Sequence, residues 1–206
     1  MIEFLLVPAG LVVGLLVAPM ATPYAGEVSR RGRVVVGLVT AALFGLLGWR
    51  AGLEPVLPAL LYLAAAGTLL GFIDVQVKRL PDRFTLSSYG IAAALLGAAA
   101  PFTDDGLRRV EHALIGGAVL FALYLVQALV VPSGIGLGDV KLSGVLGLYL
   151  GWFGQDAWII GLLATYLFGG LVAIGIMIVR RTRKGEFPFG PYMLVGALVG
   201  VLSAIA

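Results

Sequence analysis

The sequence of 206 residues lacks cysteine and holds little charge. Without cysteine it forms no disulfide, no thiolate metal site and no cysteine nucleophile. Charged residues make up 12% of it, whereas a soluble domain carries about 25%. Hydrophobic residues make up 60%, and the mean hydropathy is +1.05. These values exclude a soluble enzyme, a disordered chain and a nucleic-acid-binding protein, so we expect no nucleic-acid partner.

Apolar residues are concentrated in eight segments, which predicts an all-α, polytopic membrane protein with about eight transmembrane helices. Their approximate limits are 4–20, 34–49, 56–73, 85–100, 113–131, 140–153, 157–179 and 192–206. Several are shorter than the ~20 residues that usually cross a bilayer. Because no repeat or linker divides the chain, we expect one transmembrane domain over residues 1–206.

The basic residues predict the orientation, because Lys and Arg are enriched in cytoplasmic loops. Eleven of the fourteen fall in connections that share one side if successive helices alternate in direction. These are Arg30, Arg31, Arg33, Lys78, Arg79, Arg83, Lys141, Arg180, Arg181, Arg183 and Lys184. The other three are Arg50, Arg108 and Arg109. This asymmetry predicts an N-terminus outside and places the first group in the cytoplasm, beside the lipid bilayer.

Asp74 directly follows a wholly apolar stretch and is expected to end the third span at the cytoplasmic edge. A charged group inside a membrane is costly and often marks function. The alternative is that Asp74 only ends its helix and pairs with Lys78 at the four-residue spacing.

Asp139 begins the sixth span after a glycine-rich stretch that includes Gly136 and Gly138. Glycines allow the backbone to bend tightly and to come close to another chain. The alternative role for Asp139 is a helix N-cap. Lys141 is two positions away and cannot share a helix face with Asp139, so we interpret it as a membrane-surface anchor.

Asp82 follows Pro81 at the start of the fourth span. Pro81 argues against one continuous helix that holds both Asp74 and Asp82. We therefore expect Asp82, or Thr85, to cap the fourth span.

Asp74 and Asp139 together suggest acid–base chemistry, because they come from different helices at one membrane edge. Two neighbouring carboxylates share one proton and so supply a base and an acid, the minimum needed to hydrolyse a peptide with an activated water. Asp139, at a helix start, is predicted to be the anion more often than Asp74, at a helix end. The single histidine, His112, is expected in an outer loop, and we expect no cofactor and no metal.

Four polar residues inside predicted spans are interpreted as interhelical hydrogen-bonding groups rather than as catalytic ones. They are Tyr124, Gln127, Tyr149 and Tyr166.

The motifs from about residue 55 onwards closely resemble those of type IV prepilin peptidases, which are membrane aspartic endopeptidases of the GxGD type. The matching segments are Ile73–Asp74, Leu80–Asp82, Thr85–Leu86, Gly136–Lys141 and Phe187–Pro191. The resemblance implies that Asp74 and Asp139 are the catalytic pair. It also implies a location in the prokaryotic cytoplasmic (inner) membrane, and a substrate: the short, basic, cytoplasmic leader of a prepilin-like or pseudopilin-like membrane protein of a type IV pilus or protein secretion system.

We also expect supporting roles for further residues. Gly136 and Gly138 would shape an active-site loop that approaches an extended substrate. The turn that holds Pro188, Gly190 and Pro191 would line the same cytoplasmic mouth, or would serve packing only. Asp82 and Lys141 are possible supporting residues of the site.

One feature of the larger bacterial members is missing from the sequence. They carry a cytoplasmic insert with paired Cys-x-x-Cys motifs and N-methyltransferase activity after the first helix. Here the corresponding connection is residues 21–33 and has no cysteine. We therefore expect a compact, peptidase-only form without methyltransferase activity.

Three alternatives stay open on sequence grounds. A GxGD protease of the presenilin or signal-peptide-peptidase kind would carry a Pro-Ala-Leu motif after both acids, and here that motif lies before them, within residues 57–60. A transporter or channel would place its acids nearer the bilayer midplane. A catalytically idle assembly component of a pilus system would share the motifs. The oligomeric state and the substrate sequence are not predicted.

Overall fold

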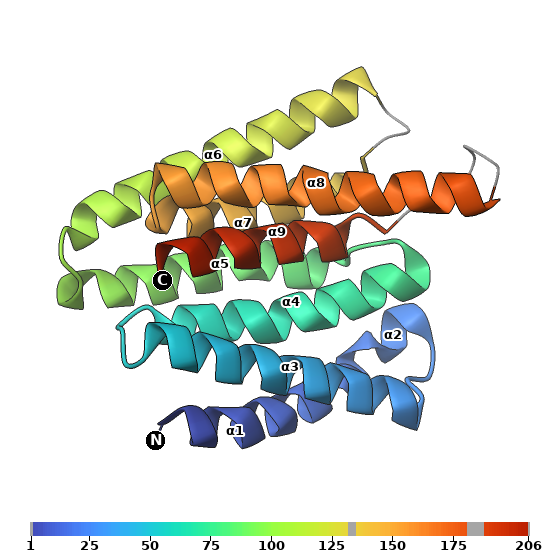
Figure 1. Cartoon of the computed structure of the whole chain (residues 1–206), viewed down its shortest axis with the longest axis horizontal. Helices are drawn as coiled ribbons and strands as arrows, with labels where there is room; N and C mark the ends of the chain where they lie inside the picture. Colours follow the sequence, from blue (N-terminus) through green and yellow to red (C-terminus); the bar gives the residue numbers. More distant parts are fainter. Residues whose placement is uncertain (1, 132–134, 181–187, 206) are drawn as a thin grey trace.

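The protein is all-α in the part of the chain that its computed structural model describes, which is residues 2–131, 135–180 and 188–205 (Figure 1). Eight long helices there confirm the predicted fold class: α1 (Ile2–Val17), α3 (Arg30–Ala51), α4 (Leu57–Val77), α5 (Asp82–Ala99), α6 (Gly106–Val130), α7 (Leu137–Trp152), α8 (Gln155–Arg180) and α9 (Gly190–Ala204). Short helical segments lie between them: η1 (Ala18–Ala21), α2 (Thr22–Ala25) and η2 (Ala100–Phe102).

Six of the described helices are long and apolar enough to cross a membrane by length and composition, as expected of a multi-pass membrane protein. They are α1 with its continuation through α2, then α3, α4, α5 with η2, α6 and α8. The two remaining helices, α7 and α9, have 16 and 15 residues. Helix α7 is buried almost throughout from residue 142 to residue 152, so its neighbours cover it and it has little surface to offer to lipid.

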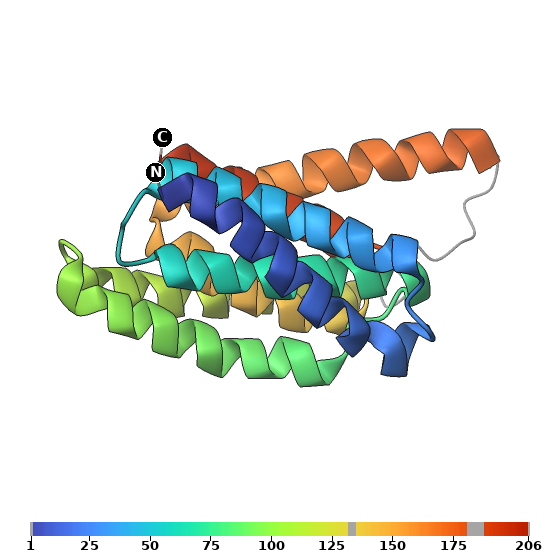
Figure 2. The ribbon, with the colours of Figure 1, turned by 90° about the horizontal axis from the view of Figure 1, so that it is seen from below.

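Helix α7 lies at the centre of the molecule. It packs against α5, α6, α8 and α9, while α3 packs between α1 and α4 on one side of the bundle. The long helices run nearly parallel to one another, and both chain termini lie at the same end (Figure 1). The second half of α8 extends away from the other helices (Figure 2), and its residues 171–178 are exposed or half-buried, which suits contact with lipid.

Glycines allow close contacts of α6 with α7 and of α8 with α9. At Gly116 and Gly147 the backbones of α6 and α7 approach so closely that a Cβ on either residue would overlap the other helix. Between α8 and α9, a Cβ at Gly196 would overlap Thr165 and the carbonyl of Gly161. Small residues permit such contacts where no hydrophobic force draws helices together in lipid.

Three helices extend beyond the apolar segments that predicted them. Helix α4 continues past residue 73 and ends at Lys78, which has a left-handed backbone with φ of 53°. Asp74 therefore lies inside the helix and does not end it. Helix α7 begins three residues earlier than predicted, and α6 begins at Gly106, so His112 lies in an exposed helical turn and not in a loop. Hydropathy marks only the apolar part of a helix, and polar end turns escape it.

Candidate active site

Asp74 is a buried carboxylate on the last turns of α4, with 3% of its surface exposed. Its Oδ2 accepts a hydrogen bond of 2.9 Å from the backbone N–H of Gly190, the first residue of α9. A Cβ at position 190 would lie 2.9 Å from the same oxygen, which explains why glycine stands there. The predicted alternative, an ion pair with Lys78, is not formed among the described side chains.

Asp139 is the third residue of α7, and its side chain is half-buried. Its Oδ2 accepts a hydrogen bond of 3.2 Å from the backbone N–H of Gly136 at the N-cap position. Asp139 is therefore not the N-cap that the alternative interpretation gave. Instead, Asp139 lies at the third position of the helix and accepts the N–H of the N-cap residue Gly136, as an acidic residue does in a capping box.

The structure places Asp74 near the end of α4 and Asp139 at the start of α7, at the same end of the bundle (Figure 1). Each carboxylate accepts an N–H at the start of a helix, Asp74 from α9 and Asp139 from α7. A helix start favours an anion. The expected asymmetry between the two acids is therefore unsupported, because that prediction counted only the helix on which each acid lies and left out α9.

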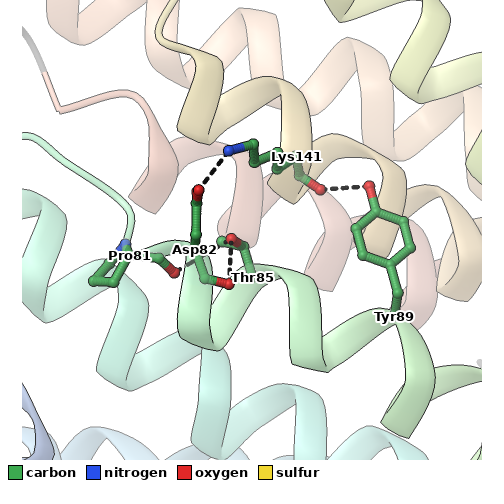
Figure 3. A network of polar contacts seen from close by, with 5 residues as sticks. All are labelled: Pro81, Asp82, Thr85, Tyr89 and Lys141. Atoms are coloured by element: carbon green, nitrogen blue, oxygen red, sulfur yellow. Dashed lines mark hydrogen bonds and ion pairs between the residues drawn. The ribbon is translucent and has the colours of Figure 1, made fainter.

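Asp82 and Lys141 form an ion pair of 2.6 Å between the starts of α5 and α7 (Figure 3). Their side chains are 59% and 31% exposed. The expected cap at Asp82 is wrong: Pro81 takes the N-cap position, and the Thr85 hydroxyl donates to the Pro81 carbonyl instead of capping the helix. Lys141, predicted to be a membrane-surface anchor, is held by this pair.

A second contact in Figure 3 also joins α5 to α7. The hydroxyl of Tyr89 donates a hydrogen bond of 2.7 Å to the carbonyl of Lys141. Together with the ion pair it links the start of α7, which carries Asp139, to α5. The ion pair itself lies at the surface, because both of its side chains are partly exposed.

Gly138 packs against the connection between α4 and α5. A Cβ there would lie 2.9 Å from the Cβ of Leu80 and 3.3 Å from its backbone nitrogen. Gly136 is exposed, and a Cβ there would meet only the carboxylate of Asp139 and the backbone nitrogen of Gly138. The two glycines of the motif thus differ, since Gly138 has a packing role within the protein and Gly136 lies on the open side of Asp139.

Three aromatic rings from three elements meet beside the two acids. Tyr124 of α6, Tyr166 of α8 and Phe189 before α9 have ring centroids 6.1 to 6.3 Å apart. The Tyr166 hydroxyl donates a hydrogen bond of 2.7 Å to Oε1 of Gln127, which confirms the interhelical role predicted for both residues. We call these three rings the aromatic cluster. The charge of Asp139 acts on Tyr124, so the cluster borders the site.

The sequence did not single out the aromatic cluster, because no spacing rule connects residues 124, 166 and 189. Tyr149, the fourth predicted hydrogen-bonding residue, donates to the Ala59 carbonyl at 3.0 Å and so confirms its own prediction.

The predicted turn before α9 is described from Pro188 onwards, and Phe187 lies outside the described residues. Pro188 is half-buried, Gly190 contacts Asp74, and Pro191 occupies the first turn of α9, where proline is tolerated. The turn therefore reaches the acids through Gly190. The basic residues at 181, 183 and 184 also lie outside the described part of the chain.

The arrangement suits proton transfer. Two interacting carboxylates hold one proton between them and present a base and an acid to the same substrate atom. Within the described residues, no group of three or more His, Cys, Asp or Glu side chains is arranged to hold a metal ion.

Residues 61–174 match the profile of the type IV leader peptidase family, and both acids fall in that range. The chain is 36% identical over 137 residues to the prepilin leader peptidase/N-methyltransferase of Aeromonas salmonicida, which covers 65% of this chain and 45% of that protein. It is 31% identical over 166 residues to the protein of the same name from Pseudomonas putida. That match covers 79% of this chain and 55% of the Pseudomonas protein. The Bacillus subtilis protein of that name is 27% identical over 172 residues, and the match covers 80% of this chain and 63% of the Bacillus protein.

This chain spans about half the length of the curated relatives it matches. No solved structure matches it.

Proposed function

The chain belongs to the type IV leader peptidase family, and we propose that it is a membrane aspartic endopeptidase that cleaves the leader of prepilin-like proteins with Asp74 and Asp139. The observation that carries this proposal is the placement of the two acids. They come from different helices at one end of the bundle, where each accepts a backbone N–H at a helix start.

The proposed reaction needs one water and one shared proton. The ionised carboxylate takes a proton from the water, whose oxygen attacks the carbonyl carbon of the scissile peptide bond. The protonated carboxylate gives its proton to the carbonyl oxygen. When the C–N bond then breaks, the amine nitrogen takes the proton that the first carboxylate holds, and one hydroxyl of the tetrahedral intermediate gives its proton back to the second carboxylate. The water's oxygen stays in the new carboxyl group. No covalent enzyme intermediate and no metal take part.

The site's position supports a cytoplasmic cut. The end of α4, which carries Asp74, and the start of α7, which carries Asp139, lie at the same end of the bundle as the start of α3 (Figure 1). Three arginines are grouped at that start. Because basic ends face the cytoplasm, we propose an N-terminus outside in the prokaryotic inner membrane. The substrate would be a protein with a short basic leader followed by an apolar helix that crosses the same membrane.

We propose peptidase activity alone. The relatives' names combine leader peptidase with N-methyltransferase. In this chain the connection between α1 and α3 holds only the short η1 and α2, and no cysteine is present. That connection offers neither the length nor the thiols of the insert found in the larger members.

The test is cleavage of a prepilin-like protein from the same organism by purified protein in liposomes. We expect Asp74→Asn and Asp139→Asn each to lower the cleavage rate by at least about 100-fold, the scale of a lost acid or base. Asp82→Asn is the matched control, because it removes a third acid at the same end and should leave cleavage largely intact. Substantial cleavage by either of the first two variants, or none by the wild type, would overturn the proposal.

A further inference from the structure

An apolar groove of about 600 Å³ runs along α4 between α3 and α9. We call it the lateral groove. Helices α3 and α9 both pack on α4 (Figure 1), and residues of all three helices line the groove. On α3 its lining extends from Arg31 to Leu47, roughly 24 Å at about 1.5 Å per residue. This length approaches the ~30 Å of a hydrocarbon core, so the groove suits a segment that crosses most of the membrane.

The lateral groove is polar at one end only. Ser29, Arg31 and Gln76 line the end at the start of α3 and the end of α4. Farther along, Thr68 is the one hydroxyl in the lining, and it donates to the carbonyl of Ala64 in its own helix. A suitable occupant is thus apolar over its length and becomes polar where it reaches the basic end.

The polar end of the groove adjoins the two acids. Phe72 and Val75 line the groove and flank Asp74 on α4. Pro191 lines it from α9 and directly follows Gly190, whose N–H donates to Asp74. A chain that leaves the groove at this end reaches the catalytic pair after it passes the start of α9.

The floor of the groove favours a helix over a lipid chain. Ala64, Gly67 and Gly71 line it from α4, and small residues let the backbone of a second helix come close. The side chain of Leu194 now lies over both glycines, and it is a flexible group that an incoming helix can displace. An acyl chain has no backbone to bring close and needs no such floor.

We propose that the lateral groove binds the apolar transmembrane helix of the substrate and so places the start of that helix, with the scissile bond before it, beside Asp74 and Asp139. This inference rests on the proposed function, which supplies a substrate whose cleavage site directly precedes an apolar helix. It assigns a binding surface to α3, which lies outside the family match at residues 61–174.

Cross-linking tests the groove without relying on cleavage. Because the chain has no cysteine of its own, an introduced cysteine is the one thiol in the protein. Val39 lines the groove and is 44% exposed, whereas its neighbour Leu38 is 57% exposed and is not part of the lining. The enzyme carries Val39→Cys or Leu38→Cys together with Asp139→Asn, so that the substrate is not cut. The substrate is a series of prepilin-like proteins, each with one cysteine at a different position of its apolar helix. We expect Val39→Cys to form disulfides with substrate cysteines that recur every three to four positions along the helix. We expect Leu38→Cys to form none.

Cleavage kinetics give a second, independent measurement. Val39→Trp fills the groove and should raise KM for the membrane-anchored substrate by about tenfold with kcat unchanged, the sign of lost uniform binding. Leu38→Trp should leave both constants unchanged. A soluble peptide that covers only the leader and the first residues after the cut should be cleaved equally by the wild type and Val39→Trp.

The outcomes separate the two proposals. If the wild type cleaves but Val39→Trp is unimpaired and no disulfide forms, the groove does not hold the substrate helix. A photoactivatable phospholipid that labels Val39 while the substrate does not cross-link would identify a lipid site and overturn the inference. If disulfides form but the wild type cleaves nothing, the groove stands and the proposed peptidase activity fails.

Discussion

The backbone N–H of Gly190 donates a 2.9 Å hydrogen bond to Asp74, although 116 positions separate the two residues in the chain. The contact places the start of α9 over the carboxylate, which is almost fully buried. Asp139, in contrast, is half-buried and lies beside the exposed Gly136. Asp139 is therefore the more accessible of the two acids, and the start of α9 covers Asp74.

Replacing Gly190 by alanine tests this contact. The new methyl group would lie 2.9 Å from Oδ2 of Asp74 and would push the carboxylate off the N–H. A hydrogen bond to a charged group contributes about 1.5–3 kcal/mol, so we expect kcat to fall by about 10- to 100-fold. Gly170→Ala is the control, because nothing lies within 4 Å of a Cβ there. Equal rates for both variants would show that the contact does not position Asp74.

Gly138→Leu should abolish most cleavage while the protein stays inserted in the membrane. The side chain would collide with Leu80 and push the first turn of α7, with Asp139, away from α5. Gly97→Leu adds the same bulk to α5 at a site with nothing within 4 Å and should keep wild-type activity. Membrane yield and cleavage rate are compared side by side. A Gly138→Leu protein that cleaves normally would show that the close contact with Leu80 is dispensable.

The ion pair between Asp82 and Lys141 should matter little. Its side chains are 59% and 31% exposed, and exposed pairs contribute about 0.2–1 kcal/mol. Lys141→Met and Asp82→Asn should each change the cleavage rate by less than about fivefold. In a double-mutant cycle the coupling should weaken as salt rises. A loss of 100-fold from Lys141→Met alone would assign Lys141 a direct role in the chemistry.

Tyr166 should act through its ring and not through its hydroxyl. Tyr166→Phe removes the hydrogen bond to Gln127 but keeps the contact with Phe189, so cleavage should stay near the wild-type rate. Tyr166→Ala removes the ring, and aromatic pairs contribute about 0.5–1.5 kcal/mol each beyond their buried area. Phe189 then loses a packing partner, and the neighbouring Gly190, which contacts Asp74, is held less firmly. This change should lower kcat more than it changes KM. Equal losses in the two variants would point to the hydroxyl instead.

The cleavage rate should depend on pH with two limbs. The proposed reaction needs one proton on the pair, so kcat/KM should fall in acid, where both carboxylates are protonated, and in alkali, where both are ionised. The measurement is kcat/KM of the wild type across the pH range in which the protein stays folded. A rate that only rises with pH would indicate a single base and would contradict the shared proton.

The sequence by itself determined the fold class and the residues most worth testing. Eight apolar segments predicted the eight long helices, because burial in lipid requires each one to satisfy its own backbone. The scarcity of charge isolated Asp74 and Asp139, since an acid beside an apolar span is rare unless it has a role. The glycines at 136 and 138 marked the start of α7.

Only the tertiary structure decided which groups touch. Hydropathy is a local property of the chain, so it missed the last turn of α4 and gave Asp74 the wrong place at a helix end. The N–H of Gly190, the pairing of Asp82 with Lys141 and the lateral groove all depend on helices far apart in sequence. Such contacts follow from how the side chains of several helices pack together, and no periodicity along one helix encodes them.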